Sequence, residues 1–208
     1  MWRLGCLIGV YHSLSALRSY SGRRWRCVMK KRMNIVGLVA ALFLLSYAAG
    51  AAEQDRARAD IKNGQGKSVG TASLRETKDG VLIIINAKGL PQGLHAVHIH
   101  SVGKCEGPAF TSAGGHFNPL GKKHGLSNPD GPHAGDLPDM YVNKDGVGRY
   151  EALRESMTLG PGETSIFDSD RSAIVIHATA DDNMTDPAGN SGDRIACGVI
   201  TKVAAKKK

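Results

Sequence analysis

Seven of the eight histidines lie between positions 95 and 177, and two of them form the motif His98-Ile99-His100. This motif lies in a strand-like run, where residues two apart share a face, so both imidazoles can point at one ion. His177 ends a second apolar run, 174–176, and can supply a third nitrogen. Three imidazoles favour a borderline metal such as copper or zinc. The alternative is a set of ordinary surface histidines.

A second set of metal-binding residue types follows at wider spacing. His116, His124, His133 and Asp136 are separated by eight, nine and three positions, and the chain between them is rich in glycine and proline. Such a chain can fold back around a centre. Three histidines and one carboxylate complete a tetrahedral zinc site without an open position, which is typical of structural zinc. The alternative is a glycine-rich loop with incidental histidines.

Charged residues near the last histidine could support these sites. Asp181 and Asp182 follow His177, and ligating imidazoles usually donate their other ring nitrogen to a carboxylate or carbonyl. From spacing alone, an exposed loop charge explains either aspartate equally well. Arg194 stands three residues before Cys197. An arginine held there offers a fixed cation for a small anion, although surface arginines have many other uses.

The net charge of +8 belongs to the first part of the chain. Residues 1–51 contain eight of the 27 basic residues and none of the 19 acidic ones, so the remainder carries 19 basic residues against 19 acidic ones. A neutral remainder argues against a protein that binds nucleic acid or another polyanion.

The basic segment has the pattern of a leader. Residues 29–51 combine Met-Lys-Lys-Arg-Met, an apolar run at 34–47 and an alanine-rich end, which predicts a secretory signal peptide cleaved after Ala51. The run is short for a spanning helix, so we expect no stable membrane association after cleavage; a retained anchor is the alternative. Residues 1–28 form an upstream extension of uncertain status. The functional domain is then 52–208, in the periplasm or otherwise exported.

Only Cys105 and Cys197 remain after the leader is removed. Export permits a disulfide between them, and a bridge over so long a loop stabilises a domain by roughly 3–5 kcal/mol in the loop-entropy treatment. Two buried free thiols are the alternative.

The mature region reads as an all-β chain of eight strands. The strand-like runs are 59–62, 68–74, 81–85, 94–100, 139–143, 148–153, 173–178 and 196–203, and no convincing amphipathic helix interrupts them. Hairpin signals stand at 63–66 and 144–146. This pattern predicts a two-sheet sandwich or flattened barrel. Two stretches, 102–137 and 179–195, are too long for ordinary turns, and loops of this length are usually functional or disordered.

Several longer motifs carry a family resemblance. They are GLHAVHIH (93–100), GHFNPL (115–120), KHG (123–125), HAGDL (133–137) and GNSGDRIACGVI (189–200). In this order they closely resemble Cu,Zn superoxide dismutase of the bacterial, exported type, over residues 57–203. The resemblance implies an eight-stranded antiparallel Greek-key β-barrel with two long functional loops, and dismutation of superoxide to oxygen and hydrogen peroxide.

The resemblance also implies a role for each position. Copper, cycling between Cu(II) and Cu(I), would be bound by His98, His100, His116 and His177. Structural Zn²⁺ would be bound by His116, which bridges the two metals, and by His124, His133 and Asp136. Asp181 matches a carboxylate that links a copper histidine to a zinc histidine, and Arg194 matches an arginine that guides the anion. Cys105 and Cys197 match the family disulfide. His95 matches a histidine that ties a loop to the barrel.

Two departures from the animal members concern long-range attraction of superoxide. Ala178-Thr179 stand where those members carry charged residues, and the second loop has no Glu-Glu-x-x-Lys cluster. Any steering would therefore come from Lys104, Lys122 or Lys123. A homodimer is left open. The competing function is a non-catalytic exported protein that binds copper and zinc on the same fold; its expected signature, loss of a ligand or of the arginine, is absent here.

Overall fold

Strands dominate the part of the chain that the structure, a computed structural model, describes, which is residues 56–204. The expected upstream extension (1–28) and signal peptide (29–51) lie outside these residues. The described elements, in chain order, are β1 (Arg56–Asn63), β2 (Ser68–Thr77), β3 (Gly80–Lys88), β4 (Gly93–His95), β5 (Val97–His100), the 3₁₀ helix η1 (Thr111–Ala113), β6 (Met140–Val142), β7 (Val147–Arg154), β8 (Ala173–His177), β9 (Arg194–Val199) and β10 (Thr201–Lys202).

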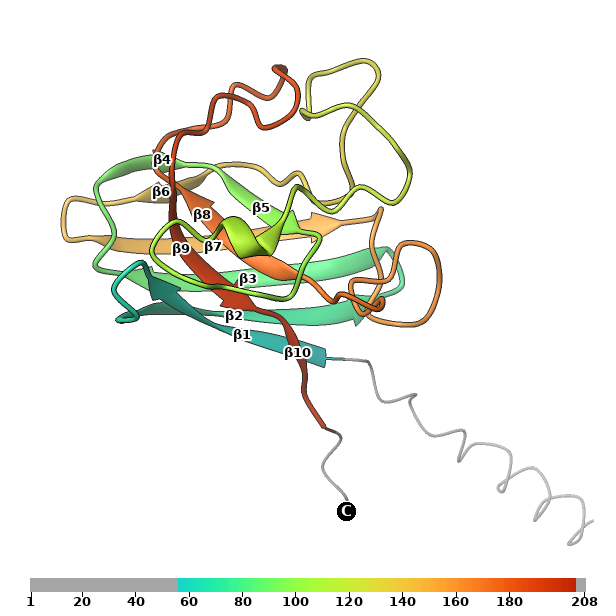
Figure 1. The fold of residues 1–208 in the computed structure, drawn as a ribbon, viewed down its shortest axis with the longest axis horizontal. Helices are drawn as coiled ribbons and strands as arrows, with labels where there is room; N and C mark the ends of the chain where they lie inside the picture. Colours follow the sequence, from blue (N-terminus) through green and yellow to red (C-terminus); the bar gives the residue numbers. More distant parts are fainter. Residues whose placement is uncertain (1–55, 205–208) are drawn as a thin grey trace, which may run out of the picture. The chain divides into compact units, whose positions relative to one another are not determined.

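The strands form one antiparallel sheet in the order β4-β6-β7-β3-β2-β1-β9-β8-β5, with β10 pairing to β1. The sheet curls into a nearly closed barrel (Figure 1), so the predicted all-β class is confirmed. The structure contains ten strands among the described residues instead of eight, because two predicted runs are divided. The backbone N–H of Ala96 donates to Thr179 O, and that of Ile200 donates to Ser172 O, which takes both residues out of the ladder.

Two hairpins are closed by asparagine side chains. Asn63 Oδ1 accepts from the N–H groups of Gln65 and Lys67, at 3.1 and 3.0 Å, between β1 and β2. Asn143 Oδ1 accepts in the same way from Asp145 and Val147, at 3.0 and 2.9 Å, between β6 and β7. A side chain that binds backbone two and four residues ahead fixes a tight turn. The two hairpin predictions are therefore confirmed.

The core follows from alternation along the strands. In β1 and β3 every second side chain is buried, and these are Ala57, Ala59 and Ile61, and Val81, Ile83, Ile85 and Ala87. In contrast, all five residues of β8 are buried. The outward face of β8 is covered by a small apolar cluster that includes Phe110, Val175 and Cys197. The disulfide Cys105–Cys197 joins the covering loop to β9, as the sequence predicts.

Two long loops follow the strands β5 and β8, and the first of them carries four of the candidate ligands, His116, His124, His133 and Asp136. The first long loop (101–139) connects β5 to β6, and the second long loop (178–193) connects β8 to β9. The yellow part of the first long loop lies beside the second long loop at the top of Figure 1, whereas η1, in the same first loop, is drawn lower, over the barrel. The two loops are hydrogen-bonded to each other, for example from Ser127 N to Asn183 O at 3.0 Å. Within residues 56–204, no helix is long and apolar enough to span a membrane.

Candidate metal centre

Strands β5 and β8 position three of the predicted ligands. The strands pair antiparallel, with His98 opposite Val175 and His100 opposite Ala173. His98 and His100 are two residues apart and therefore lie on one face of β5. His177 is the last residue of β8, next to a register shift in its pairing with β9. All three side chains are buried.

The free edge of β5 is covered by two segments of the first long loop. Phe117 N donates to Ile99 O, and Ile99 N donates to Gly135 O, at 2.8 and 2.9 Å. These bonds set His116 opposite His100 and Asp136 opposite His98 in short antiparallel bridges. The backbone approach is close, because a Cβ on Gly135 would overlap Ile99 O. A strand edge thus receives one ligand from each of two loop segments.

Four histidines form the first ligand group, defined here as His98, His100, His116 and His177. One ring nitrogen of each lies within 4.8 Å of those of the others. Four buried nitrogens have no hydrogen-bond partner in the described part of the chain: His98 Nδ1, His100 Nε2, His116 Nε2 and His177 Nε2. Buried polar groups are normally satisfied. Four such lone pairs in one cluster fit a metal that prefers imidazole nitrogen, and copper is such a metal.

The outer nitrogens of this group show which tautomer each ring adopts. His100 Nδ1 lies 2.9 Å from Gly114 O, and His177 Nδ1 lies 3.2 Å from Gly192 O. A carbonyl only accepts, so each Nδ1 carries the proton and each Nε2 keeps its lone pair. His98 is reversed, because its Nε2 lies 2.7 Å from the Asp181 carboxylate. The surroundings therefore orient the rings for an ion before any ion binds.

The second ligand group consists of His116, His124, His133 and Asp136. Asp136 Oδ1 lies 2.9, 3.1 and 3.2 Å from the Nδ1 atoms of His116, His124 and His133. Ligand atoms of a tetrahedral zinc site, each 2.0–2.1 Å from the ion, are roughly 3.3 Å apart. The donor types and the spacing of this group therefore fit zinc.

Distance alone would place His98 in this group in place of His133, because ligand atoms of His98, His116, His124 and Asp136 also lie within 4.8 Å of one another. Hydrogen bonding separates the two histidines. His98 donates from Nε2 to Asp181 and leaves its free Nδ1 to the first group. His133 instead places Nδ1 against Asp136 Oδ1. We therefore assign His133, not His98, to the second group.

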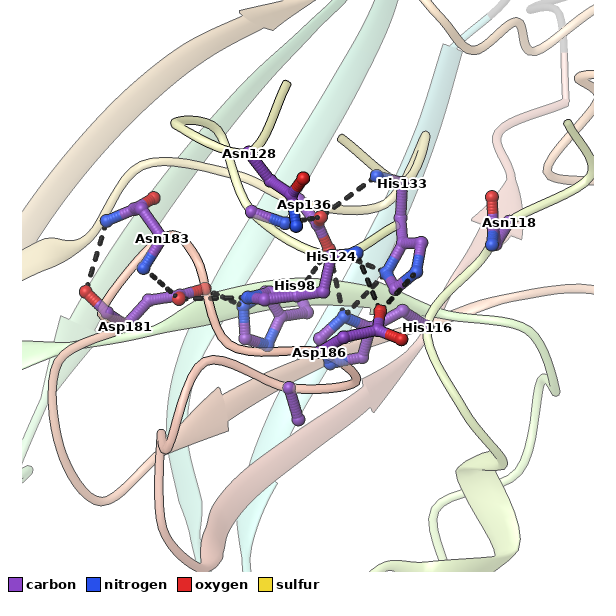
Figure 2. A network of polar contacts seen from close by, with 12 residues as sticks. His98, His116, Asn118, His124, Asn128, His133, Asp136, Asp181, Asn183 and Asp186 are labelled. Carbon is purple, nitrogen blue, oxygen red and sulfur yellow. Dashed lines mark hydrogen bonds and ion pairs between the residues drawn. The ribbon is translucent and has the colours of Figure 1, made fainter. Parts of the chain in front are cut away.

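Asp181 links the two groups. Its Oδ2 lies 2.7 Å from His98 Nε2 and its Oδ1 lies 2.9 Å from His124 Nε2. Figure 2 shows Asp181 within this polar network. The residue is only 7% exposed, so an exposed loop charge no longer explains it. Asp182, the other candidate, is exposed and binds residues of its own loop, Met184 and Thr185.

The two groups differ electrostatically. Burial lowers the pKa of His98 to about 4, that of His100 to about 2 and that of His177 to about 3. Burial acts in the same direction on His124, but hydrogen bonds to Asp136 and Asp181 outweigh it and raise the pKa of His124 to about 9. Burial alone would raise the pKa of Asp136, yet hydrogen bonds from His116 and His124 hold it well below its usual range. His98, His100 and His177 thus stay neutral at pH 7, while the second group is built around the fixed negative charge of Asp136.

Arg194 lies beside the first group, at the start of β9. Its guanidinium donates to Phe110 O at 2.8 Å and to Gly114 O at 2.7 Å. Gly114 O also accepts from His100 Nδ1, so one carbonyl connects the arginine to a histidine of the first group. His95 lies outside both groups, with Nδ1 2.7 Å from His177 O and Nε2 2.9 Å from Pro91 O.

Three polar contacts around the groups were not predicted. Asp186 Oδ1 accepts from the backbone N–H of His124 at 2.8 Å, and Asp139 Oδ1 accepts from that of Asp181 at 3.0 Å. The Arg154 guanidinium binds backbone carbonyls of the first long loop. None of them belongs to a spaced motif, so no sequence signal marks them.

Comparisons with known proteins agree on one family. The family model for copper/zinc superoxide dismutase (SODC) matches residues 68–200. Superoxide dismutase [Cu-Zn] 2 of Aquifex aeolicus is 49% identical over 174 residues, covering 83% of this chain and 99% of that protein. Superoxide dismutase [Cu-Zn] of Escherichia coli is 34% identical over 183 residues, covering 82% and 99%. The crystal structure of a SOD-like protein from Bacillus subtilis, 42% identical, matches with a TM-score of 0.66 over 68% of this chain and 95% of that one.

Proposed function

Because the chain belongs to the copper/zinc superoxide dismutase family, we propose that its two ligand groups are the copper and zinc sites of the enzyme. His98, His100, His116 and His177 bind copper, and His116, His124, His133 and Asp136 bind zinc. The observation that carries this assignment is the cluster of four buried imidazole nitrogens without a partner. The second group, with three nitrogens around one carboxylate oxygen, supports the zinc half.

The reaction converts two superoxide ions and two protons into oxygen and hydrogen peroxide. Copper, when bound, supplies the one-electron chemistry, since it alternates between Cu(II) and Cu(I). His116 supplies a route for a proton, because it presents Nε2 to the first group and Nδ1 to the second. Whenever Nε2 is not bound to copper, it would hold a proton in place of the metal and pass this proton to the peroxide that forms, while Nδ1 would keep the ring in place.

Arg194 holds the anion beside the first group. Two backbone carbonyls fix the position of its guanidinium, so the charge does not need to be ordered when superoxide arrives. Of the three lysines considered for steering, Lys123 pairs with Asp186 at 3.1 Å, which offsets its charge. Lys104 and Lys122 are exposed and make no ion pair within residues 56–204. These two are our candidates for long-range attraction.

The enzyme works outside the cytoplasm, in the periplasm or beyond. The disulfide Cys105–Cys197 supports this location, because structural disulfides persist mainly in oxidising compartments. The signal-like segment 29–51 supports it from the sequence alone.

The test is the second-order rate of superoxide decay by the full chain loaded with one copper and one zinc. We expect a value near the diffusional ceiling of ~10⁸–10⁹ M⁻¹s⁻¹, which superoxide dismutases as a class are known to approach. Arg194→Ala should slow the reaction and leave both metals bound. If the wild-type rate is no higher than that of loosely bound copper, the protein is not an enzyme but a non-catalytic protein that binds copper and zinc on the same fold. That alternative is not favoured, since every ligand position and Arg194 are present.

A further inference from the structure

A barrel residue holds the part of the first long loop that carries two ligands of the second group. Arg154 is the last residue of β7. Its Nε donates to Ala134 O at 3.0 Å, and one terminal nitrogen donates to His133 O at 2.6 Å. The guanidinium therefore binds two consecutive carbonyls of the segment between His133 and Asp136, the two candidate ligands.

The carbonyls depend on this guanidinium. Ala134 is 1% exposed and His133 is 6% exposed. Within the described residues, Ala134 O accepts no other hydrogen bond, and His133 O accepts one more, a longer bond of 3.3 Å from Asp136 N. A buried carbonyl without a partner is destabilising, because it has lost its hydrogen bonds to water and gained none in the protein. Without the guanidinium, the peptide group after His133 would turn to find another donor.

The opposite side of the same segment is attached to the β5 edge. Gly135 N donates to Phe117 O at 2.8 Å, and Gly135 O accepts from Ile99 N at 2.9 Å. The segment is thus hydrogen-bonded to β7 on one side and to β5 and its covering loop on the other. The side chains of His133 and Asp136 project from this clamped backbone and meet at 3.2 Å.

We propose that Arg154 is a positioning residue of the zinc site: its planar fork sets the backbone of 133–136 so that His133 and Asp136 meet in the ligand geometry that zinc requires. This inference rests on the proposed function. The fork is the essential feature, because a lysine ammonium is a single point charge and does not reproduce two fixed N–H directions. Arg154 touches no metal or substrate, so it acts only through the loop.

The full chain offers a matched control on the same strand. Arg149 is also an arginine of β7, but its side chain is exposed. The variants are Arg154→Gln and Arg154→Lys, each compared with the corresponding change at Arg149. Zinc affinity is measured by competition with a chromophoric chelator, and copper affinity is measured in the same way. Cobalt(II), bound in place of zinc, reports the ligand geometry through its visible absorption.

We expect Arg154→Gln to weaken zinc binding by roughly 10- to 100-fold, the range for loss of a partner that orients a ligand, and to alter the cobalt spectrum. Copper affinity should change by less than about threefold, because three of the four proposed copper ligands lie on β5 and β8 and not on this loop. If Arg154 only stabilised the fold, its loss would lower the affinity for both metals. Arg154→Lys should recover only part of the loss, and both Arg149 variants should match the wild type. If Arg154→Gln does not fold, the comparison of Arg154→Lys with Arg149→Lys decides.

Three results would overturn the inference. These are a wild-type zinc affinity in Arg154→Gln, complete recovery in Arg154→Lys, which would show that charge alone suffices, or an equal loss of copper and zinc. A wild-type chain that binds no zinc would instead contradict the proposed function, so the two failures are distinguishable.

Discussion

The first ligand group, which we propose binds copper (the copper group), and the second, which we propose binds zinc (the zinc group), are built on different kinds of backbone. Three of the four copper-group histidines lie on strands β5 and β8, inside the hydrogen-bonded sheet. All four zinc-group residues lie on the first long loop, whose only regular element is the short helix η1. The copper group is therefore positioned by the barrel itself. The zinc group depends on separate contacts that hold a loop, and these contacts come from β5, β7 and the second long loop.

The histidines of the two groups have pKa values shifted in opposite directions, which predicts that the metal-free protein is most stable near pH 6.5. Burial lowers the pKa of three histidines of the copper group, His98, His100 and His177, from 6.5 in the unfolded chain to between about 2 and 4 in the folded protein. Below pH 6.5 the unfolded chain binds more protons, so stability falls as the pH falls. Three protons correspond to a slope of at most about 4 kcal/mol per pH unit.

His124 acts in the opposite direction. Its folded pKa is raised to about 9, so the folded state binds the extra proton between pH 6.5 and 9. Stability gained from His124 is complete below pH 6.5 and is lost as the pH rises through 9. The free energy of unfolding of the metal-free chain, measured with denaturant from pH 4.5 to 9, should fall on both sides of pH 6.5, along an acid limb and an alkaline limb. His177→Gln should flatten only the acid limb and His124→Gln only the alkaline limb; limbs that flatten together would contradict separate electrostatic regions.

Removal of the shared ligand should produce the largest loss of activity. His116→Ala deletes the ring whose Nε2 faces the copper group and whose Nδ1 faces Asp136. We expect the rate of superoxide decay to fall by about 10²-fold or more, as for removal of a group that transfers a proton. Metal content per chain should be measured on the same sample. Normal turnover in this variant would disprove the bridging role.

A glycine on the loop side tests how strictly the zinc group depends on backbone contact. A Cβ at Gly135 would overlap Ile99 O and press on Phe117 N, whereas a Cβ at Gly115 has no neighbour within 4 Å. Gly135→Ala should lower the free energy of unfolding by about 1–3 kcal/mol, as overpacking does, and should weaken zinc binding. Gly115→Ala, in the same loop, should change neither quantity. Equal behaviour of the two variants would mean that the loop is not held at the β5 edge.

The same contrast explains what could be predicted from the sequence. His98 and His100 could be predicted as one site because a strand places residues two apart on one face, and His177 because it ends an apolar run. For His116, His124, His133 and Asp136, residue type indicated zinc, but the pairing of a loop with the β5 edge has no periodic signal. The family resemblance was needed to identify His116 as the ligand shared by the two sites and to choose Asp181 over Asp182.

The residues that hold the loop were not predicted at all. Arg154 and Asp186 act on backbone groups that are far away in the sequence, and long-range contacts of this kind leave no local pattern. The division of two predicted strands, at Ala96 and Ile200, was missed for the same reason. At each interruption the backbone N–H donates to a distant carbonyl, Thr179 O or Ser172 O.

The smallest expected effect concerns the contact between the two loops. Asp186 accepts from His124 N and from Lys123 Nζ, and its Oδ1 lies 3.8 Å from His133 Nε2, the outer nitrogen of a zinc-group histidine (Figure 2). The side chain is 39% exposed, so solvent screens its charge. Asp186→Asn keeps an acceptor for His124 N but removes the charge beside His133.

We expect Asp186→Asn to weaken zinc binding by less than about tenfold, below the range for a buried partner of a ligand, and to leave copper binding unchanged. Asp182→Asn is the matched control, because Asp182 lies in the same loop, is exposed, and its carboxylate accepts from Met184, Thr185 and Asn190 of that loop. Chelator competition at low and high salt measures the effect, which should shrink as salt rises. If both variants lose the same zinc affinity, the loss comes from the general surface charge and not from a contact of Asp186. The second long loop would then support the zinc group only through Asp181.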